Sequence, residues 1–290
     1  MRLAIVTAQA TDTSLRLADA VPRGIRSFVI GPEEALRELT ASDAALGRLD
    51  VRPTLDGIQD GIAQLERLEA RGVAMLNPAF TLRLAHDKLA TVAALQSAAL
   101  PHPRTRAVFD ADAPPPLPFP LVVKPRYGSW GRDVTLCPDE VTYRRVLSTL
   151  RTRAWFAASG AVAQELVPPL GHDLRIVVAG GDVIGAVKRV ARPGEWRTNV
   201  ALGAMRARVD PSPAACEIAI AAATAIGADL VGVDLLTVGP GQHVVLELNG
   251  AVDFAPVYGT DVFSAAMRAL VSRLLSDPVL PLEPIEALGA

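Results

Sequence analysis

Cysteine is scarce in this sequence. Its 290 residues include two, Cys137 and Cys216, and neither belongs to a C-x-x-C or histidine-rich pattern. This excludes a disulfide framework and a structural zinc site, and a reducing cytoplasm is the expected compartment. Dense blocks of lysine and arginine are also absent, and a net charge of -2 gives no long-range attraction to nucleic acid or anionic lipid. Any phosphate chemistry must therefore be local.

Long apolar runs are missing as well. Polar residues at 11–13 end the N-terminal apolar segment too early for a signal peptide, and the most apolar later stretch, 218–228, is far below the roughly 18 residues that span a bilayer. The chain is nevertheless 50% hydrophobic and 21% charged, which suffices for a large core and about two folding units. We therefore expect a soluble globular protein that binds neither membrane nor nucleic acid.

Residues 1–85 alternate between short apolar strands and helices. Strands are expected at 2–8, 27–31 and 72–78, and helices at 14–21 and 65–71. This alternation predicts a small α/β unit with a mainly parallel sheet. The segment has no G-x-G-x-x-G pattern, so it is not expected to bind a dinucleotide.

From residue 86 onward the pattern changes to helices mixed with hairpins, which is typical of an α+β domain. Asp87 is a suitable N-cap for a helix that Pro101 stops. A strand at 121–124, a helix at 139–150 and a strand at 161–167 are expected next. Two hairpins should turn at 180–181 and 240–241, with an alanine-rich helix at 213–227 between them.

The last hairpin predicts a cation site. A turn at residues 240–241 places Asp234 directly opposite Glu247, and Asn249 lies on the same face. Residues Val244, Leu246 and Leu248 would then point into the core. Two carboxylates that face each other repel unless a cation joins them, and this oxygen-only set suits Mg²⁺ better than zinc. The alternative is a sheet edge whose acidic side chains face solvent.

A second signal is the stretch "VVKPRYGSWGRDV". Lys124 ends an apolar strand, and Pro125 stops further strand pairing. Gly128 and Gly131 flank Ser129 and Trp130 in a loop whose amides can turn toward an anion. The pattern suits a phosphate clamp, and it is equally compatible with an ordinary surface turn.

Further charged residues support phosphate binding. Lys88 lies in the first turn of a helix, where a cation opposes the helix dipole unless an anionic ligand relieves the conflict; the alternative is a solvated lysine. Asp173 is suited either to the site or to a salt bridge with Lys188 across the strands. Arginines beside a carboxylate pair fit a metal-bound polyphosphate. The residues expected near one another are Asp173, Arg175, Lys188, Arg189, Arg197 and Asn199.

Taken in order along the chain, these features resemble the ATP-grasp ligases. The matching elements are Asp87-Lys88, the lysine strand with its glycine loop, "AQELV", "DLR", "KRVARPGEWRTN", "GVDLL" and "LELNG", over about residues 77–254. The similarity is to the RimK-type branch, which is related to glutathione synthetase. The glycine loop is most similar to LysX-type enzymes, which join an amino acid to the C-terminal carboxylate of an acidic carrier protein.

The resemblance implies a domain organisation. An N-terminal pre-ATP-grasp α/β domain with a parallel sheet would occupy residues 1–85. The ATP-grasp domain would occupy 86–290, with a lid subdomain at about 86–165 and a metal and catalytic subdomain at about 166–290.

The resemblance also implies residue roles. Lys88 and Lys124 would hold the ATP phosphates, and a lid of residues 128–132 would close over them. Binding of Mg²⁺ or Mn²⁺ would fall to Asp234, Glu247 and Asn249. Arg189, Arg197 and Asn199 would act in catalysis. The remaining nucleotide contacts would be Gly128, Ser129, Trp130, Gly131, Glu165 and Leu166 at the adenine, Asp173, and the segment Arg197, Thr198 and Asn199.

The activity implied is ADP-forming ligation of the acid–amino-acid (peptide synthase) type. A substrate carboxylate would attack the γ-phosphorus of ATP to give an acyl phosphate and ADP, and an amine would then displace phosphate to form an amide. The acceptor is either a carrier protein or a free small molecule, and relatives in this branch are often dimers or tetramers. The alternatives are an ATP-grasp phosphotransferase and a non-catalytic ATP-binding module.

Departures from the family pattern concern the substrate. Arg189 is followed by Val190 where the family usually shows paired arginines. We expect the side chains near the acceptor pocket to choose the substrate, with core packing as the alternative for Phe254 and Trp196. These side chains are Ala251, Asp253, Phe254, Tyr258, Arg126, Tyr127 and Trp196.

Overall fold

The structure is a computed structural model, and it describes residues 1–276. Its N-terminal part contains a parallel sheet in the order β2 (Arg26–Ile30), β1 (Arg2–Val6), β3 (Ala44–Gly47) and β4 (Ala74–Leu76). Three helices, α1 (Asp12–Asp19), α2 (Pro32–Glu38) and α3 (Ile62–Ala70), connect these strands. The prediction of a parallel α/β unit is confirmed, although β3 and α2 were not predicted.

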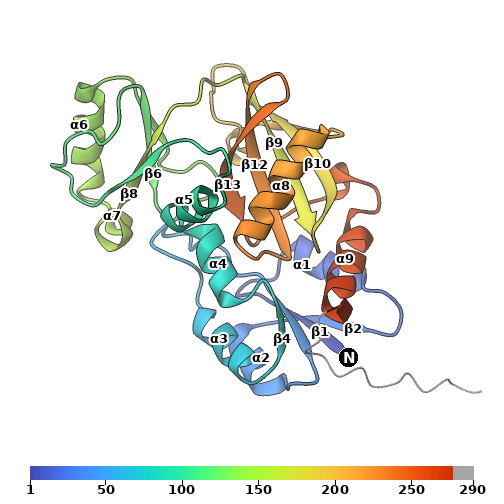
Figure 1. Cartoon of the computed structure of the whole chain (residues 1–290). Helices are drawn as coiled ribbons and strands as arrows, with labels where there is room; N and C mark the ends of the chain where they lie inside the picture. Colours follow the sequence, from blue (N-terminus) through green and yellow to red (C-terminus); the bar gives the residue numbers. More distant parts are fainter. Residues whose placement is uncertain (277–290) are drawn as a thin grey trace, which may run out of the picture.

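A second sheet is antiparallel and has the order β5 (Thr105–Val108), β8 (Ala161–Glu165), β6 (Leu121–Pro125) and β7 (Thr135–Cys137). Helices α6 (Glu140–Leu150) and α7 (Ala154–Ser159) accompany it at the upper left of Figure 1. Asp139 caps α6 by accepting a hydrogen bond from the Thr142 amide. Tyr143 and Leu147 of α6 are fully buried, which fixes this helix on the sheet.

The central sheet is antiparallel and carries both predicted hairpins. Its order is β11 (Met205–Arg208), β10 (Asp182–Val190), β9 (His172–Ala179), β12 (Leu230–Gly239) and β13 (Gln242–Asn249). Helix α8 (Pro213–Ala225) packs on one face through small side chains such as Ala215, Ala219 and Ala222. Helices α4 (Ala79–His86) and α5 (Lys88–Ser97) join the N-terminal part to the two antiparallel sheets.

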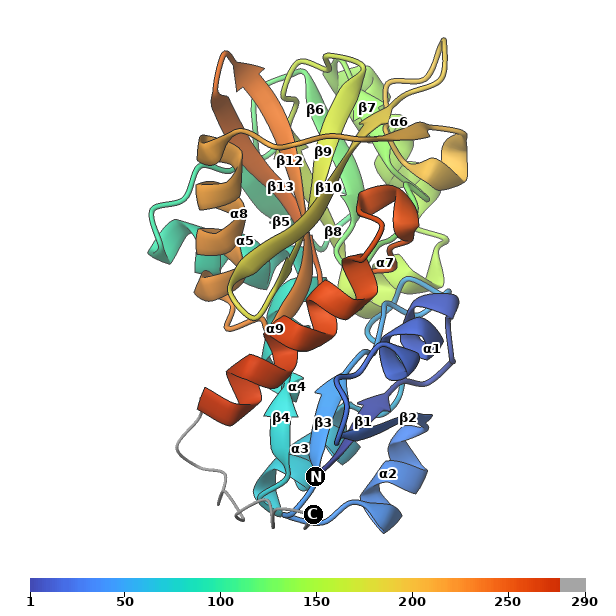
Figure 2. The same ribbon diagram turned by 90° about the vertical axis from the view of Figure 1, so that its right-hand side faces the viewer.

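Helix α9 (Val262–Ser276) lies between the central sheet and the N-terminal sheet, and Figure 2 shows it crossing the molecule diagonally. It contacts α1 and β4 on one side and β9 and β10 on the other. One buried cluster therefore contains side chains from all three regions, including Leu3, Val177 and Met267. No helix within residues 1–276 combines the length and the hydropathy needed to cross a membrane.

The predicted register of the last hairpin is present at its open end, but the strands contain two irregularities that were not predicted. Asp234 pairs with Glu247, and Gly232 with Asn249. Between Asp234 and the turn the pairing shifts twice, once on each strand, so the two irregularities cancel. The prediction that Val244 and Leu246 enter the core is wrong because of this bulge: both are partly exposed, whereas Val245 and Leu248 are buried.

Candidate functional site

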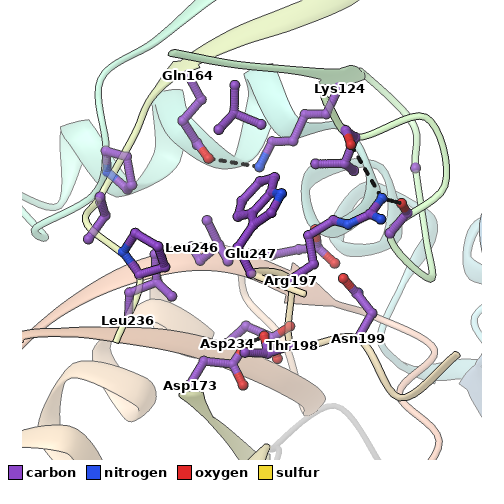
Figure 3. Close-up of a pocket in the computed structure, with 18 of the residues that line it drawn as sticks. Lys124, Gln164, Asp173, Arg197, Thr198, Asn199, Asp234, Leu236, Leu246 and Glu247 are labelled. Carbon is purple, nitrogen blue, oxygen red and sulfur yellow. Dashed lines mark hydrogen bonds between the residues drawn. The ribbon is translucent and has the colours of Figure 1, made fainter. Parts of the chain in front are cut away.

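A cavity that gathers most of the predicted site residues lies between the antiparallel sheet that contains β6 and β8 and the central sheet (Figure 3). The side chains of Val122, Leu236 and Leu246 supply apolar wall on opposite sides. Every residue predicted for catalysis, nucleotide or metal binding lines it except Asn249, which lines an adjoining pocket. The shared set is Lys88, Lys124, Gly128, Ser129, Trp130, Gly131, Glu165, Leu166, Asp173, Arg189, Arg197, Thr198, Asn199, Asp234 and Glu247.

Lys124 projects from β6 into the cavity and is buried. Its Nζ donates a hydrogen bond to Oε1 of Gln164 on β8, 2.8 Å away, and both side chains are labelled in Figure 3. Burial, with the nearby charge of Lys88, lowers the pKa of Lys124 to about 8. A bound anion would stabilise the charged form of this lysine. Gln164 was not predicted, and the signal was a polar residue inside an otherwise apolar strand.

Lys88 approaches the same cavity from the first turn of α5. Its Nζ donates to the carbonyl oxygen of Gly128, 2.9 Å away, and lies 3.6 Å from Oε2 of Glu247. Asp87 caps this helix through the Leu89 amide, as predicted. The lysine thus links the glycine loop to the predicted metal ligand.

Arg126 and Tyr127 do not face the acceptor pocket. The Arg126 guanidinium forms a bidentate ion pair with Asp87, and the Tyr127 hydroxyl donates a hydrogen bond to the same carboxylate at 3.2 Å. Although burial opposes it, the hydrogen bonds and charge of Arg126 hold the pKa of Asp87 below its ordinary value. These two side chains line neither pocket at the site and instead hold the start of α5, so their expected role in choosing the substrate gains no support from their positions.

A buried network of two acids and two arginines forms the floor of the cavity. Arg175 donates to both oxygens of Asp234, each at 2.6 Å, and Arg189 donates to Asp234 at 2.8 Å. Arg189 also donates to both oxygens of Asp173, which accepts a further hydrogen bond from the Thr198 hydroxyl at 2.6 Å. Asp173 lies opposite Arg189 in the strand register, so its partner across the strands is Arg189, and the alternative of a salt bridge with Lys188 does not hold.

The two acids of this network titrate differently. Burial raises the pKa of the Asp173 carboxyl. For Asp234 burial acts in the same direction, but the charges of Arg175 and Arg189 outweigh it and keep the pKa below its ordinary value. Asp234 is therefore charged at neutral pH although it is buried.

Asn249 lies beside Glu247 at the end of β13. With its amide oriented to satisfy its neighbours, its nitrogen donates to Oε1 of Glu247 at 3.2 Å and its oxygen accepts from Arg175 at 3.2 Å. Three arginine hydrogen bonds to Asp234 leave about one of its four lone-pair positions free. Within residues 1–276 no three His, Cys, Asp or Glu side chains gather as a metal cluster. The oxygen set of Asp234, Glu247 and Asn249 fits Mg²⁺ and needs the amide to be complete.

Arg197 holds the glycine loop. Its Nη1 donates to the carbonyl oxygens of Gly131 and Val134, at 2.9 and 3.3 Å, and its Nη2 lies 2.8 Å from Glu195. Hydrogen bonds from the Arg197 side chain and backbone lower the pKa of Glu195 to about 2. Arg197 thus fixes the position of the glycine loop through hydrogen bonds to its backbone, a role that the sequence did not predict. Figure 3 shows its side chain reaching toward the loop.

The expected adenine contacts lie at the end of β8. The Glu165 side chain forms an ion pair with Arg104 at 2.6 Å, so it is already engaged. The backbone of this segment remains as the part that can contact a base in the cavity. The Leu166 amide donates to the Pro120 carbonyl oxygen across a long 3.4 Å contact. A base that accepts a hydrogen bond from this amide would have to replace that weak contact.

A second, more polar pocket adjoins the first. It is lined by Asp50 of the N-terminal part, by Arg175 and Asn249, and by the predicted acceptor residues Ala251 and Asp253. Phe254 and Tyr258 do not reach it: both are buried in the core, where Phe254 stacks on Phe263. For Phe254 the core alternative holds, and Tyr258, for which only a role at the acceptor pocket was expected, is buried in the same core. Trp196 lines the first cavity instead.

Comparisons with known proteins identify the family of this chain. The RimK-like ATP-grasp domain matches residues 85–270. The glutamate–LysW ligase ArgX of Sulfurisphaera tokodaii is 30% identical over 217 residues, which cover 72% of this chain and 76% of the relative. A probable alpha-L-glutamate ligase of Xanthomonas campestris is 30% identical over 243 residues, covering 81% and 80% of the two chains.

Solved structures show the same fold. The D-cycloserine synthetase DcsG superposes with a TM-score of 0.71 at 21% identity, covering 94% of this chain and 100% of the other. D-alanine–D-alanine ligase from Bacillus anthracis in complex with ATP gives a TM-score of 0.70 at 15% identity, covering 95% and 97%. The predicted ATP-grasp fold and the predicted ATP-dependent joining of a carboxylate to an amine are confirmed at the level of the family. The chain belongs to the RimK-like ATP-grasp ligases.

Proposed function

We propose that the larger cavity binds ATP with Mg²⁺ and that this chain couples ATP cleavage to formation of an amide from a carboxylate and the amine of an amino acid. The observation that supports this most strongly is the arrangement of charge. Lys88 and Lys124 approach from one side, and Asp234 and Glu247 from the other, so a polyphosphate and a cation would be held together between them.

In this proposal the lysines bind and orient the phosphates. Asp234, Glu247 and Asn249 hold Mg²⁺, which neutralises charge on the transferring phosphoryl group when bound. Arg189 donates hydrogen bonds to Asp173 and Asp234 and so holds these side chains in place below the reacting groups. The substrate carboxylate attacks the γ-phosphorus, ADP leaves, and the amine then displaces phosphate from the acyl phosphate.

Arg197 and Asn199 keep water away from this intermediate. Arg197 fixes the glycine loop by its carbonyl oxygens, and the Asn199 side chain packs against Gly131. A loop held shut over the cavity protects an acyl phosphate from hydrolysis. Both residues would therefore act in catalysis indirectly, by holding the lid closed.

The amine substrate that we propose first is glutamate. Both groups of curated relatives named above are glutamate ligases, one of them acting on LysW. The carboxylate would be supplied by a carrier protein or by a smaller acceptor. The second pocket, which adjoins the metal ligands, is the place for these substrates.

The test is to combine the protein with ATP, Mg²⁺, glutamate and a pool of carboxylate acceptors, and to follow phosphate release and product mass. We expect one amide product for each ADP formed. ADP with a phosphorylated product and no amide would instead favour a phosphotransferase. Glu247→Gln should abolish Mg²⁺-dependent turnover and leave the fold intact, and full activity in this variant would contradict the proposed metal set.

A further inference from the structure

The second pocket lies where a parallel sheet is expected to bind a ligand. In the N-terminal sheet the chain places β2 on one side of β1 and β3 on the other, so the order reverses between β1 and β3. Ligands of open α/β sheets bind beyond the carboxyl ends of the strands at such a point. Asp50, three residues after the end of β3, lines the pocket here.

This pocket is continuous with the proposed ATP site. Ser129, Trp130, Arg189, Asn199 and Glu247 line both cavities. A molecule in the second pocket would therefore meet the lid and the metal ligands from the side of the N-terminal sheet.

Almost all the charges around the second pocket are already paired. Arg175 and Arg189 are held by Asp234. Asp253 accepts hydrogen bonds from Arg48 at 3.0 Å and from Thr11 at 2.9 Å.

Asp50 is the exception. Its Oδ1 accepts a hydrogen bond from the Val51 amide at 2.7 Å, and 34% of its side chain is exposed. Within residues 1–276 no lysine or arginine nitrogen lies within 4.0 Å of its carboxylate. The nearest basic group is Nδ1 of His86, at 3.9 Å.

His86 does not neutralise Asp50. Its side chain is buried, and its Nε2 finds no hydrogen-bond partner among residues 1–276. Burial lowers the pKa of this imidazole, against the smaller influence of Asp50, so the ring is neutral at pH 7. Arg48 acts on Asp50 through its charge without touching it, because its guanidinium donates to Asp253. Within the described part of the chain, a carboxylate with no lysine or arginine in contact therefore faces a pocket at the edge of the reaction site, and a cation would complete it.

We propose that Asp50 binds the ammonium group of the amino acid that supplies the amine, which makes it a specificity-determining residue. This inference rests on the proposed ligase function. An ammonium group offers three donors to a carboxylate, and charge-assisted hydrogen bonds of this kind are stronger than neutral ones. The contact would select amino acids with a free amino group and exclude molecules whose nitrogen is acylated.

The test measures binding and does not need turnover. The melting temperature of the protein with Mg²⁺ and a non-hydrolysable ATP analogue is recorded with each of the twenty common L-amino acids. We expect at least one to raise the melting temperature, its N-acetyl derivative to have no effect, and Asp50→Asn to weaken its binding at least tenfold. Asparagine retains an oxygen for the Val51 amide, so the local fold should persist.

Asp60→Asn is the matched control. Asp60 belongs to the same part of the chain and is 93% exposed, pairs with Arg52 on the surface, and does not line the second pocket. Its substitution makes the same change in net charge, and we expect wild-type amino-acid affinity. An equal loss of affinity in both variants would mean that general charge, and not a contact, explains the effect.

Three results would overturn the assignment: no stabilisation by any of the twenty amino acids, equal stabilisation by the N-acetyl form, or unchanged affinity in Asp50→Asn. The N-acetyl comparison uses the wild-type protein and holds even if the variant unfolds. Amide formation with unchanged affinity in Asp50→Asn would reject the contact and retain the ligase. Loss of binding in this variant without any amide product would retain the contact and reject the ligase.

Discussion

Nη1 of Arg197 donates a hydrogen bond to the carbonyl oxygen of Gly131 over 2.9 Å. The arginine follows the central sheet and the glycine follows β6, so this bond joins the two walls of the cavity through the lid. Because the acceptor is a backbone oxygen, it persists when a lid side chain is changed, and the contact is lost only if the loop itself moves. The arginine is therefore the partner to change.

Arg197→Ala should loosen the lid. We expect kcat for amide formation to fall at least tenfold and the ratio of ADP to amide to rise, because water would reach the acyl phosphate. The measurement is ADP and amide from the same reaction. Arg192→Ala, in an exposed residue of the same segment, is the control and should behave as wild type. A fall in rate with an unchanged ADP-to-amide ratio would contradict a role in excluding water.

Gly131→Ala should disturb the same contact by another route. Gly131 has a φ of +71°, and an added Cβ would lie 2.6 Å from Oδ1 of Asn199. A left-handed conformation costs a non-glycine residue roughly 1–2 kcal/mol, so the loop should move away from residues 197–199. We expect reduced activity with a nearly unchanged melting temperature. At Gly128 the nearest atom to an added Cβ is 3.4 Å away, so Gly128→Ala should be milder.

ATP affinity should depend on pH through Lys124. Burial lowers the pKa of this lysine to about 8, so its positive charge is present below that value and is lost as the pH rises through it. ATP binding, followed from pH 6.5 to 9.5, should weaken above about pH 8. In Lys124→Arg the charge persists over this range, and the decline should disappear. The same decline in both proteins would assign it to another group.

The buried pair of Asp173 and Arg189 should matter for stability. Asp173 is fully buried, and removal of its guanidinium partner leaves an uncompensated charge. Arg189→Met should lower the free energy of unfolding by about 3–5 kcal/mol, measured by urea denaturation. Asp173→Asn in addition should restore part of the loss. A double variant less stable than Arg189→Met alone would contradict this explanation.

Some of this site could be predicted because a turn sets a register. Placing the turn at residues 240–241 was enough to bring Asp234 opposite Glu247, and the two shifts in the hairpin cancel before that pair. The side to which Leu246 points could not be predicted, because one extra residue reverses the alternation of a strand. Strand β3 was missed because its four residues carry no periodic pattern.

Contacts between distant segments were the other gap. The pairing of Arg126 with Asp87 and of Arg197 with the lid depends on which surfaces meet after folding. The same holds for Asp50, which no lysine or arginine of residues 1–276 contacts. Residue type alone suggested a ligand for Arg126 and Tyr127, and the tertiary structure uses them to hold a helix end. Lys88 and Lys124 were easier to predict because each interrupts the local pattern of its own element.

The cluster shared by Leu3, Val177 and Met267 bears on how this protein can be divided. The family match starts at residue 85, which invites expression of the rest of the chain without its first 84 residues. Such a fragment would expose one side of α9 and the apolar side chains that pack against β1 and β4. It would also lack Arg48, whose buried guanidinium donates to the carbonyl oxygen of Val252. The start of the family match at residue 85 is therefore not a boundary at which the chain can be truncated without exposing part of its core.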